Sequence, residues 1–105
     1  MPTFEAGERF EQDYKRLRPD QRARFRQALR EFIGALREWE QQQRPGVPRF
    51  PAHLGVKPMV GQHGVIMELR WAADGRCTWQ YGRPRHRRFH NIRRRIGTHA
   101  IYDEP

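Results

Sequence analysis

The sequence of 105 residues has one cysteine, two lysines and no apolar run as long as a membrane span or a signal-peptide core. The lone Cys77 excludes a disulfide within the chain and is compatible with a reducing compartment. We therefore expect a cytoplasmic protein with no membrane partner. The length predicts one domain over residues 1–105, and the twelve aromatic residues make a modest core feasible.

Acidic residues are scarce in the second half of the chain. Residues 41–102 hold twelve basic groups against only Glu68 and Asp74, whereas residues 1–40 hold nine basic and eight acidic groups. Arginine supplies 19 of the 21 basic residues, and its planar fork matches phosphate and stacks on bases. A high-GC genome explains part of the lysine depletion but not the position of the charge. The balance therefore favours a nucleic-acid partner.

Apolar spacing in the first half predicts two helices after a short opening strand at 3–5. Phe10, Tyr14 and Leu17 recur at helical spacing and predict a helix over 7–17. Pro19 suits the first turn of a second helix, which we expect to reach about residue 42. The apolar stripe of this second helix comprises Phe25, Ala28, Leu29, Phe32, Ile33, Leu36 and Trp39. The two helices are expected to form an antiparallel hairpin.

After the Pro-rich stretch 45–48 the apolar period changes from 3.6 to 2, which is typical of strands. Alternation predicts strands over 53–59, 65–71 and 76–81, and the Asp-Gly step at 74–75 predicts a hairpin turn. A final strand is expected over 91–102. The predicted fold is therefore α+β: an N-terminal helical hairpin on one face of a small, mostly antiparallel twisted sheet, in the order β-α-α-β-β-β-β.

The final run, residues 91–102, carries three consecutive arginines and a histidine among isoleucines. Strict alternation would bury Ile92 and Ile96 and place Arg93, Arg95 and His99 on the opposite face. That face would also collect polar residues of the other strands, namely Lys57, Glu68, Arg70, Arg76, Thr78 and Gln80. Such a face suits a polyanion. The alternative is a basic edge strand that only blunts aggregation.

At this point the chain resembles toxins of the RelE/ParE superfamily from type II toxin–antitoxin systems. The resemblance covers most of the chain in element order and lies mainly in residues 54–57, 64–81 and 96–102. Ile96-Gly97-Thr98-His99-Ala100-Ile101-Tyr102 is its most specific part, and is similar to the ending of ribosome-dependent mRNA interferases of the RelE and YafQ kind. The resemblance implies a helical hairpin on a twisted sheet, cleavage of mRNA in the ribosomal A site, and an acidic antitoxin that wraps the toxin.

Carried over by position, the resemblance implies a phosphate-contacting Lys57, a catalytic imidazole at His99 and an aromatic near the scissile base at Tyr102. Where several members have an arginine early in the central strand this chain has Ile66, so another cation would supply that charge: Arg70, Arg76 or Arg95. The His99–Tyr102 spacing is also one residue shorter than in the YafQ-like ending.

The expected chemistry is attack by a 2′-hydroxyl on the adjacent phosphorus, which requires no metal because the nucleophile belongs to the substrate. His99 would act as acid or base, Glu68 as its partner base, and Tyr102 would stack on a base. Arg70, Arg93 and Arg95 would hold phosphates. In the basic loop 83–88 we expect Arg87 and Arg88 to contact the backbone of rRNA or mRNA.

Plainer roles stay open for each residue. Glu68 would then pair with a cross-strand arginine, Tyr102 would close the core, and Lys57 and His99 would simply be solvated. The histidines and Cys77 show no metal-ligand spacing, and no cofactor is expected. The sequence also leaves two other functions open: a ParE-like inhibitor of DNA gyrase, and a basic nucleic-acid-binding module without activity.

Overall fold

A computed structural model describes residues 3–42, 48–59, 66–82 and 90–105. Its elements are β1 (Thr3–Ala6), α1 (Glu8–Arg16), α2 (Pro19–Gln41), the 3₁₀ helix η1 (Ala52–Leu54), β2 (Lys57–Pro58), β3 (Met67–Arg70), β4 (Gly75–Tyr81), β5 (His90–Thr98) and the 3₁₀ helix η2 (His99–Asp103). The five strands form one sheet in the order β1-β5-β4-β3-β2. β1 is parallel to β5, and the remaining pairs are antiparallel. The predicted α+β fold is confirmed.

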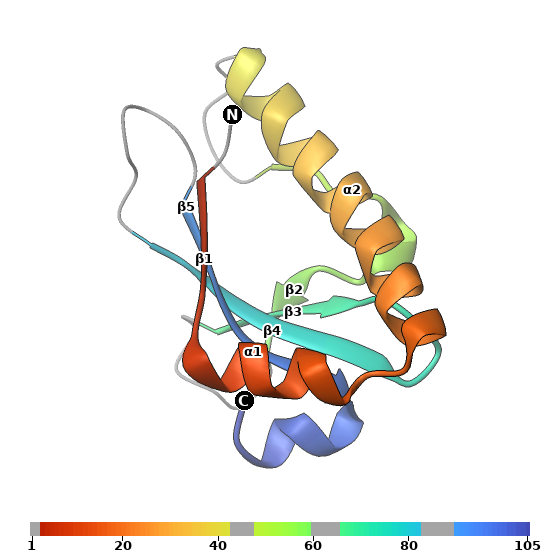
Figure 1. Ribbon diagram of the computed structural model, residues 1–105. Helices are drawn as coiled ribbons and strands as arrows, with labels where there is room; N and C mark the ends of the chain where they lie inside the picture. Colours follow the sequence, from red (N-terminus) through yellow and green to blue (C-terminus); the bar gives the residue numbers. More distant parts are fainter. Residues whose placement is uncertain (1–2, 43–47, 60–65, 83–89) are drawn as a thin grey trace.

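Both helices begin as the sequence predicts. Gly7 precedes α1, whose first turn carries Glu8 and Glu11 and whose last turn carries basic residues, as the helix dipole favours. Pro19 opens α2, and the Gln21 side chain accepts a hydrogen bond from the Arg18 amide at 2.8 Å, closing the first turn. The helices diverge from their short link and cover one face of the sheet (Figure 1).

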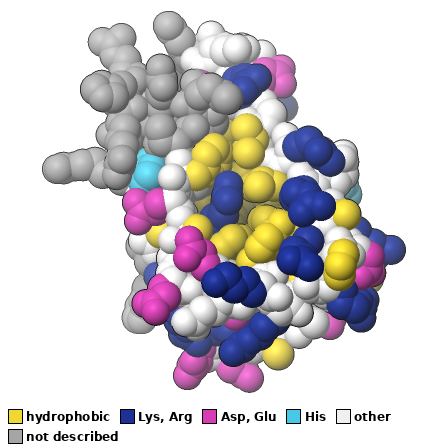
Figure 2. All heavy atoms as spheres, viewed as in Figure 1, with side chains coloured by type: hydrophobic (Ala, Val, Ile, Leu, Met, Phe, Trp, Pro, Cys, Tyr) yellow, Lys and Arg dark blue, Asp and Glu magenta, His cyan; other side chains and the backbone are white. Residues whose placement is uncertain are grey.

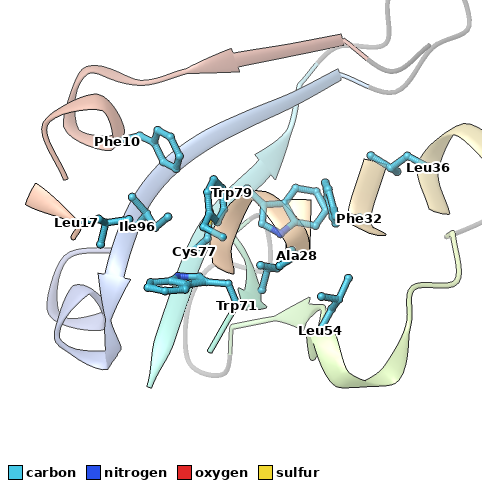
Figure 3. Close-up of a cluster of buried hydrophobic side chains, with 12 residues drawn as sticks. Phe10, Leu17, Ala28, Phe32, Leu36, Leu54, Trp71, Cys77, Trp79 and Ile96 are labelled. Carbon is cyan, nitrogen blue, oxygen red and sulfur yellow. The ribbon is translucent and has the colours of Figure 1, made fainter. Parts of the chain in front are cut away.

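The core lies between the helices and this face of the sheet. Phe10, Phe25, Phe32 and Leu36 are buried, as predicted, and Tyr14 and Leu29 pack against them. From the sheet they meet Trp71, Cys77, Trp79 and Ile96 (Figure 3). The ring of Phe32 stands edge-on to that of Trp79, with centroids 4.9 Å apart. The apolar stripes of the two helices therefore hold the sheet from one side only.

In the turn between β3 and β4, Gly75 lies directly against the ring of Trp71. The Trp71 amide donates a hydrogen bond to the Gly75 carbonyl, and the Gly75 amide donates one to the Ala72 carbonyl. A Cβ on Gly75 would lie 2.6 Å from the Trp71 ring, so the indole needs a glycine there. The expected Asp-Gly hairpin is present, and it holds Asp74 at its tip.

Two predicted strands are wrong in extent. Residues 52–54 form η1, which ends at Gly55 in the left-handed region with φ 55°, so that strand shrinks to Lys57–Pro58. The final strand ends at Thr98, and residues 99–103 turn back as η2.

The predicted faces of β5 are also partly wrong. Thr78 pairs with Arg95 while Trp79 pairs with Arg93, so Arg94 is an extra residue in a β-bulge. One extra residue reverses the alternation beyond it. Arg93 consequently shares the helix-covered face with Trp79. Ile92 pairs with Gln80 and Ile96 with Cys77, so the two isoleucines lie on opposite faces.

Candidate functional site

An open cavity of 420 Å³ lies on the sheet face opposite the helices. It combines side chains of β2, β3, β4 and η2. Its lining comprises Gly55, Lys57, Met59, Glu68, Arg70, Arg76, His99 and Tyr102. Six of these eight are residues that the sequence singled out, so the fold brings most of the predicted site together.

Strand register explains how the residues of the strands meet. Lys57 pairs with Glu68 across β2 and β3, and Arg70 pairs with Arg76 across β3 and β4. Directly paired residues share a face of the sheet, and the intervening Leu69 lies in the core on the other face. The cavity wall is therefore a direct result of alternation in β3.

The 3₁₀ helix η2 adds the last two residues. The Thr98 hydroxyl accepts a hydrogen bond from the Ala100 amide at 3.3 Å and caps the first turn. A Cβ at Gly97 would lie 2.9 Å from Cγ2 of Ile101, so the helix turns tightly back against β5. This turn brings His99 and Tyr102 to the cavity formed by β2, β3 and β4.

Asp74, in the turn between β3 and β4, holds the side chain of His99 by a hydrogen bond. Its Nδ1 lies 2.5 Å from Oδ1 of Asp74, and the hydrogen bond with the imidazole keeps the pKa of Asp74 below its ordinary value. The Tyr102 ring stands perpendicular to the imidazole with centroids 5.5 Å apart. Nε2 makes no hydrogen bond to the part of the chain that the structure describes. The half-exposed imidazole is thus oriented through its Nδ1.

Tyr102 presents a hydroxyl rather than a phenolate. Burial, reinforced by the nearby carboxylate of Glu68, raises the pKa of Tyr102 to about 12. Within 3–42, 48–59, 66–82 and 90–105 the buried oxygen makes no hydrogen bond of good geometry, although Glu68 and Arg76 lie close enough to act on its pKa. A buried hydroxyl without a partner is rare in native proteins and is a group that a ligand can satisfy.

The charged side chains of the cavity wall differ in the ion pairs and hydrogen bonds that they form. Lys57 Nζ lies 3.5 Å from Oε1 of Glu68, whose side chain is 15% exposed. Arg70 is exposed and forms no ion pair with any described residue. Arg76 is buried, and its Nη1 donates to the carbonyls of Ala72, Ala73 and Gly75 at 3.2, 3.3 and 2.9 Å. Arg76 therefore also fixes the turn that carries Asp74.

Other predicted site residues lie elsewhere. Arg93 faces the helices because of the bulge, with its guanidinium 4.9 Å from the centre of the Phe4 ring. Arg95 does not line the cavity: its guanidinium binds Asp13 at 2.6 and 3.1 Å and the carbonyl of Glu104 at 3.0 Å. The expectation that Arg93 shares a face with Arg95 and His99 is therefore wrong. Arg95 pairs with Thr78 and keeps the expected face, but its guanidinium is engaged by Asp13 rather than by the cavity. Arg87 and Arg88 lie outside the described residues.

Asp74 is a site residue that the sequence analysis missed. The Asp-Gly step was fully accounted for by turn chemistry, and nothing local links it to a histidine 25 positions later. The signal available was that Asp74 and Glu68 are the only acidic residues in the basic stretch 41–102. Among the described residues no group of three His, Cys, Asp or Glu side chains is arranged to hold a metal. No described helix is long and apolar enough to cross a membrane.

Solved structures of toxins share this fold. The crystal structure of the E. coli DinJ–YafQ complex matches with a TM-score of 0.61 at 15% identity, covering 96% of this chain and 97% of that chain. A YoeB/ParE toxin from Agrobacterium tumefaciens matches at 0.58 and 11% identity, covering 92% and 98%. The RelB–RelE antitoxin–toxin complex from Methanococcus jannaschii matches at 0.53 and 18% identity, covering 95% and 98%. No protein-family model matches the chain, and no curated sequence matches it significantly.

Proposed function

Because the chain has the fold of the YafQ, RelE and YoeB/ParE toxins, we propose that it is the toxin of a toxin–antitoxin pair and acts in the cytoplasm as a ribosome-dependent endoribonuclease. One observation carries this proposal. An imidazole oriented by Asp74 shares a cavity with Glu68, the hydroxyl of Tyr102 and three cationic side chains. This set contains an acid, a base and electrostatic stabilisers, which is what cleavage of RNA by its own 2′-hydroxyl needs.

In the proposed reaction Glu68 accepts the 2′-hydroxyl proton while the 2′-oxygen forms a bond to the adjacent phosphorus. The bond from phosphorus to the 5′-oxygen breaks, and His99 donates a proton from Nε2 to that oxygen. The products are a 2′,3′-cyclic phosphate and a 5′-hydroxyl. Asp74 is a positioning residue, because its bond to Nδ1 leaves Nε2 to face the leaving group.

The remaining residues of the cavity stabilise charge and hold the substrate. Arg70, which is exposed and unpaired among the described residues, would bind the scissile phosphate, and Lys57 would add its charge. Tyr102 stays protonated at neutral pH because its pKa is about 12, so its hydroxyl can donate to a phosphate or ribose oxygen. The buried Arg76, which backbone carbonyls hold in place, would add a fixed positive charge that stabilises the phosphate in the transition state.

The partners follow from the same proposal. The substrate is mRNA in the ribosomal A site, and the basic surface would also contact rRNA. The net charge of +9 would be complemented by an acidic antitoxin. In the matching structures, YafQ and RelE are described in complexes with DinJ and RelB.

The proposal is tested by single-turnover cleavage of a programmed ribosome with saturating protein. The account expects a cut in the A-site codon whose 5′ fragment ends in a 2′,3′-cyclic phosphate. Asp74→Asn should slow cleavage and shift its pH profile, whereas loss of a purely structural contact would leave the profile in place. If the parent protein never cleaves but inhibits supercoiling by gyrase, the ParE-like function replaces this one.

A further inference from the structure

A second open cavity, of 370 Å³, lies between α2, η1 and the turn that follows β3. Its volume falls within the range of about 300–1,000 Å³ that small-molecule sites occupy. Three of its lining residues belong to the buried cluster of the core and form an apolar floor (Figure 3): Ala28, Leu54 and Trp71. The other side chains are polar and comprise Arg24, Gln27, Glu31, His53 and Arg70. An apolar floor with a few convergent polar groups is typical of a ligand site.

An ion pair between α2 and η1 holds one polar group of this cavity in place. Nε2 of His53 lies 2.7 Å from Oε2 of Glu31, whose side chain is 35% exposed. The η1 turn that carries His53 is anchored by Leu54, which is 1% exposed, and ends at Gly55. The second carboxylate oxygen of Glu31, Oε1, accepts no hydrogen bond from any described residue. Glu31 is therefore an oriented acceptor with one oxygen left for a ligand.

Two arginines supply hydrogen-bond donors to the same cavity. Arg24 and Glu31 lie on one face of α2, two helical turns and about 10 Å apart along its axis. Arg24 and Arg70 are exposed, and neither forms an ion pair within the described part of the chain. Arg70 also lines the cavity that contains His99, so it lies where the two cavities meet. Figure 2 shows further Lys and Arg side chains in dark blue along the right-hand side of the molecule, where α2 runs in Figure 1, so the surroundings favour an anionic ligand.

We propose that this second cavity binds the guanine base of a nucleotide, with the phosphate of that nucleotide against Arg70. Guanine donates hydrogen bonds from N1 and N2 on one edge and accepts them at O6 and N7 on the next, so Glu31 and Arg24 each meet the edge that complements them. Adenine has an acceptor at N1 and a donor at C6, and sets like groups against both residues. The uncharged base covers the apolar floor, while the phosphate stays at the exposed arginine. The nucleotide is either free or part of an RNA.

The inference does not depend on RNA cleavage, and binding alone tests it. Chemical shifts of the ¹⁵N-labelled full chain are followed by NMR while 5′-GMP, AMP, CMP or UMP is added. We expect GMP to bind at least about fivefold more tightly than each of the other three, as one well-formed bidentate contact to a base allows. The shifts should centre on Gln27, Leu54 and Ala72 rather than on Tyr102.

Two substitutions with matched controls separate recognition of the base from general charge. Glu31→Gln should abolish the preference for GMP, whereas Glu11→Gln, which removes the same charge from an exposed position of α1, should preserve it. Arg24→Gln should weaken GMP binding at least about fivefold. Arg16→Gln, at an exposed position of α1, should change GMP affinity less than about twofold.

Inosine 5′-monophosphate keeps the test decisive if Glu31→Gln lowers the fraction of folded protein. This nucleotide lacks the N2 amino group, so the parent protein should bind it more weakly than GMP, and Glu31→Gln should bind the two equally. The 2′-O-methyl trinucleotide ApGpU, which cannot be cleaved, identifies the source of the base. Binding tighter than that of GMP would indicate RNA, and equal or weaker binding would indicate a free nucleotide.

Three results would overturn the proposal. The first is no binding, or equal binding of all four nucleotides, because the cavity would then contribute no more than charge. The second is a set of shifts confined to the cavity around His99. The third is a preference for GMP that survives Glu31→Gln.

Discussion

Asp13 of α1 is the buried carboxylate on which the junction of helix, strand and C-terminal segment depends. Its side chain is 8% exposed and accepts from Arg95 Nε at 2.6 Å, from Arg95 Nη2 at 3.1 Å and from the backbone amide of Ile96 at 3.2 Å. The last residue of β1, Ala6, pairs with Arg93, so beyond that point β5 has no strand on this side. Asp13 supplies the acceptor that a continuing strand would have supplied.

We predict that Asp13→Asn lowers the free energy of unfolding by about 3–5 kcal/mol, because it leaves the partly buried charge of Arg95 without a counter-ion. That is a large part of the ~5–15 kcal/mol that stabilises a typical domain. The hydrogen bond that Arg95 donates to Asp13 raises the pKa of Arg95 in the parent protein. The variant loses this effect, but a guanidinium group still keeps its charge at neutral pH, so the cost cannot be relieved by deprotonation.

The measurement is urea-induced unfolding followed by tryptophan fluorescence, with the double variant Asp13→Leu/Arg95→Met as the control. Replacing both charges by apolar groups of similar size should recover most of the loss, since neither charge is then stranded. A loss under about 1 kcal/mol for Asp13→Asn would refute the reasoning. So would a double variant that loses the sum of the two single substitutions, because the two residues would then act independently.

Three further predictions concern the core, pH and the site. Phe32→Ala should lower the free energy of unfolding by about 3–5 kcal/mol in the same urea assay. Burial raises the pKa of Cys77 from 9.0 to about 12, because the folded state disfavours the thiolate. The buried neutral thiol therefore stabilises the fold fully below pH 9, and this contribution is lost as pH rises toward 12, where the unfolded chain gains from ionisation. Alkaline urea titrations should show this loss, on the order of 4 kcal/mol, and Cys77→Ala should remove that part of the pH dependence. Tyr102→Phe should change stability little, because the buried hydroxyl makes no hydrogen bond of good geometry within the described chain, yet slow single-turnover cleavage.

Much of the fold could be predicted because local and global preferences agree. Helical spacing around Phe25 and Phe32 predicts buried helix faces, and these residues lie in the core. The Asp-Gly step predicts a tight turn, and Gly75 is needed there for contact with Trp71. The cavity could be predicted in part for the same reason: alternation in β3 places Glu68 and Arg70 together, away from the core.

The errors arose where a single residue changes the geometry. Strict alternation cannot reveal that Arg94 is inserted as a bulge, and that insertion separates Arg93 from Arg95. The partners of Arg95 lie 82 positions away in α1 and at the C-terminal end, so no local pattern marks it as structural. Asp74 was missed because its partner His99 comes close only through η2.

The central claim, that the cavity around His99 cleaves RNA, is tested most directly by the rate of single-turnover cleavage of a programmed ribosome by His99→Ala at saturating protein. General acid–base catalysis contributes about 10²–10⁴-fold, so the account predicts a loss of that order with ribosome binding retained. Cleavage by His99→Ala at the parent rate, with the same 2′,3′-cyclic phosphate product, would contradict the account.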